Sequence, residues 1–332
     1  MMLNISSSFK NLDGMLIMFA LLLTVLLVTP QAYAKVKFVR MVSGPEGGSW
    51  YPLGSAMMKI AEQDVSGIST KNGPGGGVGN CKDVQGGRAD LGWSYTHTAF
   101  NAFNGKGKFK KKHDKLRHLM SLYPGVFQIA VPKKSDITDI GQLADKRIVP
   151  GKVGFTGTAI AEIVMKAYDI SFKSIKAKGG TVSYVGYADS SALMKDGHSD
   201  SFMAVTSCPQ ATLIDLDFRP GVRFLSIDDA HIKRIKEIEP GLMPTVIPKS
   251  AYKGLTADVQ TVGTVTNIIV SADLSDDLVY QIVKSIYAGF PELAKIKKKA
   301  ISESDPKKAL QGNNIPVHPG AMKYYKEMGI AK

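Results

Sequence analysis

Short apolar segments alternate with stretches of helical spacing along most of the chain. Val36 to Val42 alternates and is rich in β-formers, which predicts a strand, whereas Ala159 to Tyr168 places its apolar residues on one face of a helix. Further strand-like segments occur at 91–93, 116–123, 126–131, 147–149, 182–185, 201–205, 222–225 and 264–270, with helical patterns between many of them. Because short strands alternating with helices favour parallel sheets covered by helices, the pattern predicts an α/β fold.

Two segments far apart in the chain have the same order of strand, polar turn and helix start. They begin at Phe127 and at Asn267. A chain that crosses twice between two lobes would place such strands side by side as a hinge, near Gln128 and Thr266. We therefore expect residues 35–133 and 262–332 to form one lobe and residues 134–261 to form the other.

The N-terminus has the pattern of a secretory signal peptide. Met15 to Val28 is an apolar run, and Ala32-Tyr33-Ala34 follows it as a small-x-small cleavage site. The run is shorter than the roughly 20 residues that span a bilayer, although an uncleaved anchor is the alternative. We expect residues 1–34 to be a signal peptide cleaved near Ala34, and the mature protein to be periplasmic. No cysteine stands at the cleavage site, which argues against a lipoprotein.

The net charge of +13 is compatible with nucleic acid, a membrane surface or an anionic ligand as the partner. Secretion argues against nucleic acid. Much of the charge lies in two lysine runs, at 106–115 and 295–299, and neither is interleaved with stacking aromatic residues. The runs are interpreted as a solvated loop and a solvated helix face, with a docking patch for a partner as the alternative. The net charge leaves an anionic ligand open as well.

Cys81 and Cys208 are the only two cysteines. A disulfide would require their Cα atoms to lie within ~7 Å. We expect them on opposite lobes near the cleft, as buried and unpaired thiols, because free cysteine is among the most buried residue types.

Three glycine-rich loops, at 44–51, 73–80 and 150–158, each precede a predicted helix. A helix N-terminus offers unpaired N–H groups and the positive end of a dipole, and glycine allows a close approach to the backbone. Three such ends facing one cleft would bind a carboxylate, although each loop alone could be a tight turn. None of the loops matches the phosphate-binding or dinucleotide-binding fingerprint.

Motifs for catalysis and metal binding are missing from the sequence. There is no Gly-x-Ser-x-Gly, His-Glu-x-x-His or Cys-x-x-Cys, and the six histidines form no i, i+3 or i, i+4 pair. We therefore expect no catalytic residues, no metal site and no cofactor, and binding is favoured over catalysis.

An ordered set of motifs resembles the TAXI-type solute receptors of tripartite ATP-independent periplasmic (TRAP) transporters. In chain order these motifs are Gly47-Gly48-Ser49-Trp50-Tyr51-Pro52-Leu53-Gly54, the glycine run ending in Asn80, Gly87-Arg88-Ala89-Asp90-Leu91, Leu122-Tyr123-Pro124, Asp139-Ile140-Gly141-Gln142-Leu143 with Lys146-Arg147-Ile148, Gly154-Phe155-Thr156-Gly157-Thr158, Ala272-Asp273-Leu274-Ser275-Asp276-Asp277-Leu278-Val279, and Ile315-Pro316-Val317-His318-Pro319-Gly320-Ala321. They span nearly the whole mature chain, and their order makes the set specific.

The resemblance implies a two-lobed type II periplasmic-binding-protein fold, with two mixed sheets flanked by helices, a hinge and an interlobe cleft. It implies a monomer that binds glutamate, glutamine or a related dicarboxylate and delivers it to TRAP membrane subunits. By family position, the cleft would be lined by Ser49, Trp50, Tyr51, Asn80, Tyr95, Thr156, Gly157, Thr158 and Ser207.

This chain departs from the family pattern at several of these positions. Phe155-Thr156-Gly157-Thr158 stands where Gly-Ser-Gly-Thr is usual, and Trp50 stands where tyrosine is common. Ser94-Tyr95-Thr96-His97 and Thr206-Ser207-Cys208 are also atypical. The identity of the ligand therefore stays open. A periplasmic sensor module and an enzyme on the same two-lobed scaffold are the alternative functions.

Overall fold

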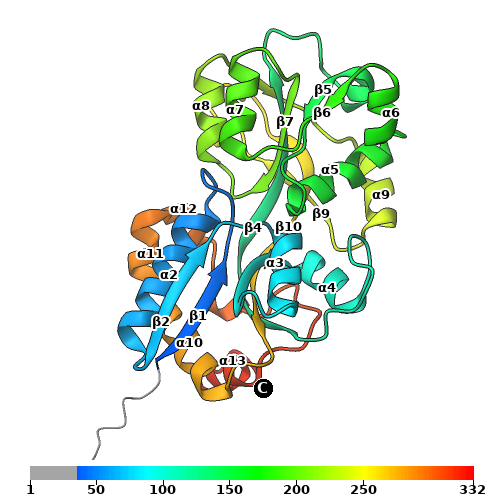
Figure 1. Ribbon diagram of the computed structural model, residues 1–332. Coiled ribbons are helices and arrows are strands. Elements are labelled where there is room, and N and C mark those ends of the chain that lie inside the picture. Colours follow the sequence, from blue (N-terminus) through cyan, green and yellow to red (C-terminus); the bar gives the residue numbers. More distant parts are fainter. Residues whose placement is uncertain (1–35) are drawn as a thin grey trace, which may run out of the picture. The chain divides into compact units, whose positions relative to one another are not determined.

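One arrangement of three strands and two helices occurs twice in residues 36–332, the part of the chain that the computed structural model describes (Figure 1). The first group consists of β1 (Lys37–Val42), α2 (Trp50–Asp64), β2 (Ile68–Gly73), α3 (Gly77–Gln85) and β3 (Leu91–Tyr95). The second group consists of β5 (Arg147–Val149), α5 (Thr156–Ala167), α6 (Phe172–Ala177), β6 (Thr181–Val182), α7 (Tyr187–Lys195) and β7 (Ser201–Thr206), in which α6 is an insertion. The strand orders β2-β1-β3 and β6-β5-β7 are equivalent, and the strands pair in parallel.

Two long antiparallel strands join the groups. They are β4 (Leu116–Pro132) and β10 (Val259–Ser271), which pair with Gly263 opposite Val126. The first group adds β3 to β10, and the second adds β7 to β4. Two shorter strands complete the sheet, β8 (Val222–Phe224) beside β4 and β9 (Met243–Ile247) beside β10.

The predicted α/β fold class is confirmed, with one difference in the sheets. The strands of both groups form one ten-stranded sheet where two were expected, because β4 and β10 run through both groups. β4 also continues through Pro124, where the sequence predicts two separate strands. The β4–β10 pair lies where the hinge strands were expected, whereas the lobe boundaries at 133 and 262 stay a prediction. Residues 1–34, the predicted signal peptide, lie outside the described residues.

Helices cover both faces of the sheet (Figure 1). In the first group, α4 (Thr96–Asn104) lies beside α3. On the other face, α10 (Asp276–Ala288) and α11 (Phe290–Ile296) pack against α2, while α12 (Lys298–Ser302) packs against α11 and α13 (Pro319–Glu327) against α10. In the second group, α8 (Ala211–Phe218) lies beside α7 and α9 (Asp229–Ile238) beside α5. Short 3-10 helices occur at Ile140–Asp145 and Pro306–Lys308. Apolar side chains such as Leu53, Met57 and Val279 are fully buried between these layers. No helix within residues 36–332 is long and apolar enough to cross a membrane.

Each group is held together by the same arginine–aspartate contact. The Asp90 carboxylate accepts hydrogen bonds from the Arg40 backbone N–H at 2.8 Å and from the Arg40 guanidinium at 3.0 Å. In the second group, the Asp200 carboxylate accepts the equivalent bonds from Arg147, also at 2.8 and 3.0 Å. Both contacts fasten the segment before the third strand of a group to its first strand.

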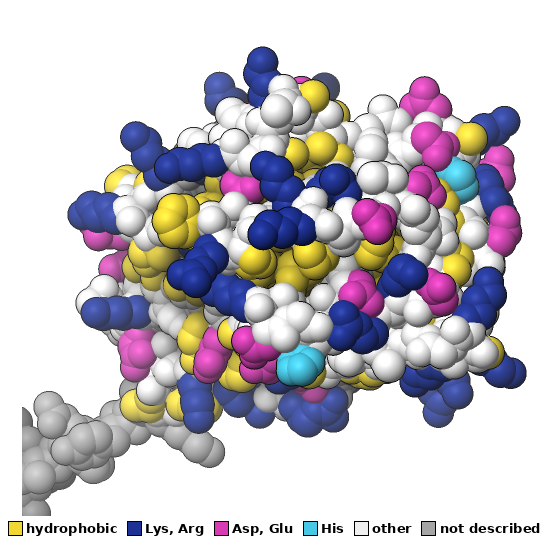
Figure 2. Space-filling view, turned by 90° about the horizontal axis from the view of Figure 1, so that it is seen from above, with side chains coloured by type: hydrophobic (Ala, Val, Ile, Leu, Met, Phe, Trp, Pro, Cys, Tyr) yellow, Lys and Arg dark blue, Asp and Glu magenta, His cyan; other side chains and the backbone are white. Residues whose placement is uncertain are grey.

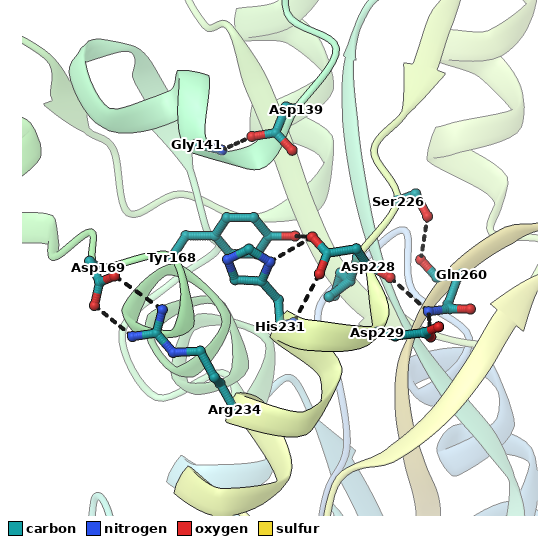
Figure 3. A network of polar contacts seen from close by, with 11 residues as sticks. Asp139, Gly141, Tyr168, Asp169, Ser226, Asp228, Asp229, His231, Arg234 and Gln260 are labelled. Carbon is teal, nitrogen blue, oxygen red and sulfur yellow. Dashed lines mark hydrogen bonds and ion pairs between the residues drawn. The ribbon is translucent and has the colours of Figure 1, made fainter.

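A polar network ties α9 to the end of α5 (Figure 3). The Tyr168 and His231 rings stack with their centroids 3.5 Å apart, and His231 Nδ1 lies 2.6 Å from the Asp228 carboxylate. The Arg234 guanidinium donates two hydrogen bonds to the Asp169 carboxylate. These contacts are satisfied among the side chains themselves, which indicates a role in packing the second group.

A cavity between the two groups

A small cavity lies where the first and second groups meet. Its lining residues are Pro45, Gly48, Ser49, Trp50, Gly76, Gly77, Tyr95, Phe155, Thr156, Gly157, Tyr187, Val205 and Thr206. Tyr95 ends β3 and Thr206 ends β7, so the cavity lies at the carboxyl ends of the parallel strands. The centre of a water molecule can occupy about 20 Å³ of the cavity, which is enough room for one water molecule. An organic solute would therefore require the groups to part or the lining side chains to turn.

Four helices begin at this cavity, two from each group. Trp50, Gly77, Thr156 and Tyr187 are the first residues of α2, α3, α5 and α7, and all four line it. The first-turn N–H groups of a helix have no acceptor within the helix, and the helix dipole places partial positive charge there. The cavity is therefore bordered by four helix starts, which suit an anion.

Glycine allows the two groups to approach at this point. A Cβ atom on Gly77 would lie 2.3 Å from Thr156 Oγ1, and one on Gly76 would lie 2.4 Å from the Phe155 ring and 3.0 Å from the Gly154 carbonyl oxygen. The Gly79 N–H also donates to the Gly154 carbonyl at 3.0 Å. The glycine run thus contacts the second group directly.

Aromatic side chains form much of the lining. The Trp50 and Tyr95 rings pack with centroids 4.7 Å apart, and the Phe155 and Tyr187 rings meet edge to face at 5.8 Å. The hydroxyls of Tyr95 and Tyr187 both donate to the Val205 carbonyl, at 3.0 and 3.2 Å. The Tyr95 bond therefore joins the first group to β7 of the second.

Five of the nine predicted site residues line the cavity: Ser49, Trp50, Tyr95, Thr156 and Gly157. Tyr51 follows Trp50 and Ser207 follows Thr206 in the sequence, but neither residue lines the cavity. Tyr51 is on α2, where its carbonyl accepts a hydrogen bond from Asn72.

Asn80 and Thr158 support the cavity from behind. Asn80 Oδ1 accepts from the Gly76 N–H, and its Nδ2 donates to the carbonyls of Ser43 at 2.6 Å and Trp93 at 2.7 Å. Thr158 Oγ1 contacts the carbonyls of Pro150 and Lys152 in its own loop. Because their polar atoms bond to these backbone groups, both side chains hold their loops in place. Residues next to them in the sequence line the cavity.

The sequence interpretation missed Phe155, Tyr187 and Thr206 as lining residues. Gly186 directly before Tyr187 was the available signal, because a glycine before a helix start resembles the three loops that were singled out. This fourth loop was missed because it contains only one glycine.

A buried polar chain leads from the cavity wall to the long strands. His97 contacts Thr264 of β10 through Nδ1 at 2.9 Å and Thr98 through Nε2 at 3.1 Å, and Thr98 Oγ1 lies 3.4 Å from Thr156 Oγ1. Burial lowers the pKa of His97 to about 3, so the ring is neutral at ordinary pH. The chain is thus an uncharged contact between the groups.

Cys81 and Cys208 are buried and unpaired, as the sequence predicts. Cys81 lies on α3 and contacts Ser94, whereas Cys208 follows β7. Burial raises the pKa of Cys81 to about 12 and that of Cys208 to about 11. Both thiols are therefore protonated and unreactive in the folded protein.

None of the described residues that line the cavity is charged, whereas a wider hollow that adjoins it has charged residues. We call this outer hollow the mouth. The charged residues among those described around it are Glu46, Asp83, Lys152 and Asp189. Asp83 is paired with Arg88. Among residues 36–332, no cluster of three or more His, Cys, Asp or Glu side chains is placed to hold a metal ion.

The two-group architecture with a cavity at the carboxyl ends of its strands is that of the type II periplasmic binding proteins. One solved structure, described as a periplasmic transporter, shares 16% identity and a TM-score of 0.51 over 90% of this chain and 94% of its own. The structure of periplasmic binding protein BugD shares 17% identity and a TM-score of 0.51 over 89% of this chain and 99% of its own. At these identities the likeness shows the fold. Residues 41–329 match the NMT1-like family, and the chain belongs to that family.

Proposed function

We propose that this protein is a solute receptor that holds a small carboxylate-bearing solute between two lobes and delivers it to TRAP membrane subunits. The lobes would be residues 35–133 with 262–332, and residues 134–261. The proposed location is the periplasm, reached through the signal peptide expected at residues 1–34.

The convergence of four helix N-termini on one cavity carries the proposal. They come from both groups, so a carboxylate held there would contact both lobes and favour the closed arrangement. The resemblance to TAXI receptors supports the TRAP partner and suggests glutamate, glutamine and related dicarboxylates as first candidates.

The lining supports binding rather than catalysis. Four of its hydroxyls contact other hydroxyls or carbonyls, those of Ser49, Tyr95, Thr156 and Tyr187. Ser49 Oγ lies 2.9 Å from the Tyr123 hydroxyl, and Thr156 Oγ1 lies 3.4 Å from that of Thr98. An enzyme would need a nucleophile or hydroxyl activated by a neighbouring base. We therefore infer a binding protein without catalytic activity.

A thermal-shift screen tests carboxylate binding. A ligand at 100 times its dissociation constant adds about 2.7 kcal/mol to the free energy of unfolding. We expect at least one small carboxylate to raise the Tm, and Thr156→Val to weaken its binding about tenfold relative to wild type by isothermal titration calorimetry. Thr181→Val, at an exposed position in β6, is the matched control and should bind normally. The absence of a shift with any carboxylate would contradict the proposal.

Reconstitution tests delivery. Proteoliposomes containing the TRAP membrane subunits proposed as partners should take up the bound solute only when the receptor is added. Binding without uptake, together with a partner kinase that responds to the loaded receptor, would support the sensor alternative instead.

A further inference from the structure

The cavity lining has a property that narrows the class of solute, on the basis of the proposed receptor function. None of the described residues that line it is Lys, Arg, Asp, Glu or His. Within the lining itself, positive potential comes from the helix starts, which suit an anionic group. A second charge of either sign would have no countercharge inside the cavity.

Two of the oxygen atoms that an ammonium group could use are already engaged in the closed arrangement. The Val205 carbonyl already accepts from two tyrosine hydroxyls. Ser49 Oγ is engaged by the Tyr123 hydroxyl. Because an ammonium carries three donors that must be satisfied on burial, an α-amino acid would be bound at a large loss of affinity.

The acidic groups at the mouth do not remove this problem. An α-ammonium is separated from its carboxylate by a single carbon atom, so it would lie inside the cavity beside the helix starts. Glu46 and Asp189 line the outer hollow and not the cavity. A second carboxylate that reached outward would approach these acids, with Lys152 as the one cation described there.

The aromatic rings define the remaining part of the solute. Trp50 and Tyr95 from the first group and Phe155 and Tyr187 from the second all line the same cavity. Flat apolar groups pack well between such rings, in offset or edge-to-face contact.

We propose that the solute is a monocarboxylate whose single negative charge sits at the helix starts, and whose aromatic or apolar body lies among these four rings, with no ammonium group. This excludes glutamate and glutamine within the carboxylate class.

Three probes that share the 3-phenylpropanoate unit test the proposal: 3-phenylpropanoate itself, phenylalanine, which adds an ammonium, and benzylsuccinate, which adds a carboxymethyl group and with it a second carboxylate. Calorimetry on the protein secreted from the full chain should show 3-phenylpropanoate binding at least a hundredfold more tightly than either of the others. Glutamate should bind no more tightly than phenylalanine. Equal or tighter binding of phenylalanine, benzylsuccinate or glutamate would overturn the inference and leave the receptor function standing. No binding by any carboxylate would overturn both.

A variant pair checks where the body lies. Trp50→Ala should weaken 3-phenylpropanoate binding more than tenfold, with the folded state verified by circular dichroism. Phe218→Ala, which removes an aromatic ring that is 82% exposed on α8, should leave the affinity unchanged. Unchanged affinity in Trp50→Ala would place the solute elsewhere and contradict the inference.

Discussion

The first and second groups share one backbone plan but contribute differently to the cavity. In each group the first strand is pinned by an arginine–aspartate contact, and two helices begin at the cavity. The glycines that cap the second of these helices nevertheless differ. A Cβ on Gly76, before α3, would overlap the Phe155 ring, whereas one on Gly186, before α7, would meet nothing nearer than 3.7 Å. The shared backbone arrangement therefore explains why helices begin at the cavity in both groups. The contact between the groups explains why a glycine is required at position 76 and not at position 186.

Charge separates the two regions as well. The first region, residues 36–133 with 262–332, contains 24 lysines and arginines and 13 acidic residues. The second region, residues 134–261, contains 16 lysines and arginines and 15 acidic residues. Figure 2, seen from the end of the second group, shows basic and acidic side chains interspersed on that face. The residues of the lysine run at 106–115 lie outside the cavity lining, and most are exposed. The excess of positive charge is thus a property of the surface of residues 36–133 and 262–332, separate from the cavity lining.

The largest effect is expected from the pair of capping glycines. Gly76→Ala should weaken solute binding more than a hundredfold, because its methyl group prevents the two groups from meeting at Phe155. Gly186→Ala should change the affinity less than twofold. Calorimetry on both variants checks this, and equal effects would mean that the closed contact at Gly76 is not needed for binding.

The two arginine–aspartate contacts should contribute equally to the free energy of unfolding. Asp90→Asn and Asp200→Asn each remove charge-assisted hydrogen bonds, and each should lower the free energy of unfolding by about 1–3 kcal/mol. Urea denaturation measures both. A large effect at one site and none at the other would break the equivalence of the two groups.

Sensitivity to pH should come from the first region. Burial lowers the pKa of His97 to about 3 and that of His118 to about 4, so both are neutral in the folded protein and protonate near pH 6.5 when unfolded. The unfolded state then binds more protons, and stability falls as the pH falls below about 6.5. Each histidine should cost about 0.7 kcal/mol between pH 7 and pH 6.

Denaturation of His97→Asn at both pH values checks this contribution. The variant should lose less stability than the wild type over this step, whereas His198→Asn, at an exposed position in the second region, should behave as the wild type. A wild-type stability that is flat between pH 7 and pH 5 would contradict the burial of neutral histidines.

The smallest effect concerns the two cysteines, one in each region. Thiol titration of the unreduced protein should give two free thiols after denaturation and almost none in the folded state, since both side chains are buried. Finding no thiols after denaturation would indicate a disulfide and would overturn the unpaired assignment.

Much of the fold was predictable from local pattern. The strands at 36–42 and 264–270 and the helix at 159–168 follow from alternation and helical spacing. The two-residue strand β6 and the continuity of β4 through Pro124 were not predictable, because both depend on pairing with neighbouring strands.

The sequence by itself determined that glycine-rich segments precede helices, that the chain is α/β, and that hydroxyl and aromatic residues lie beside the helix starts. These properties are local, since they depend on backbone freedom and on the spacing of apolar residues. Only the tertiary structure decided that Asn80 and Thr158 hold loops while Phe155 and Tyr187 line the cavity. The physical reason is that the packing of the two groups determines which side chains line the cavity and which bond to backbone carbonyls of nearby segments.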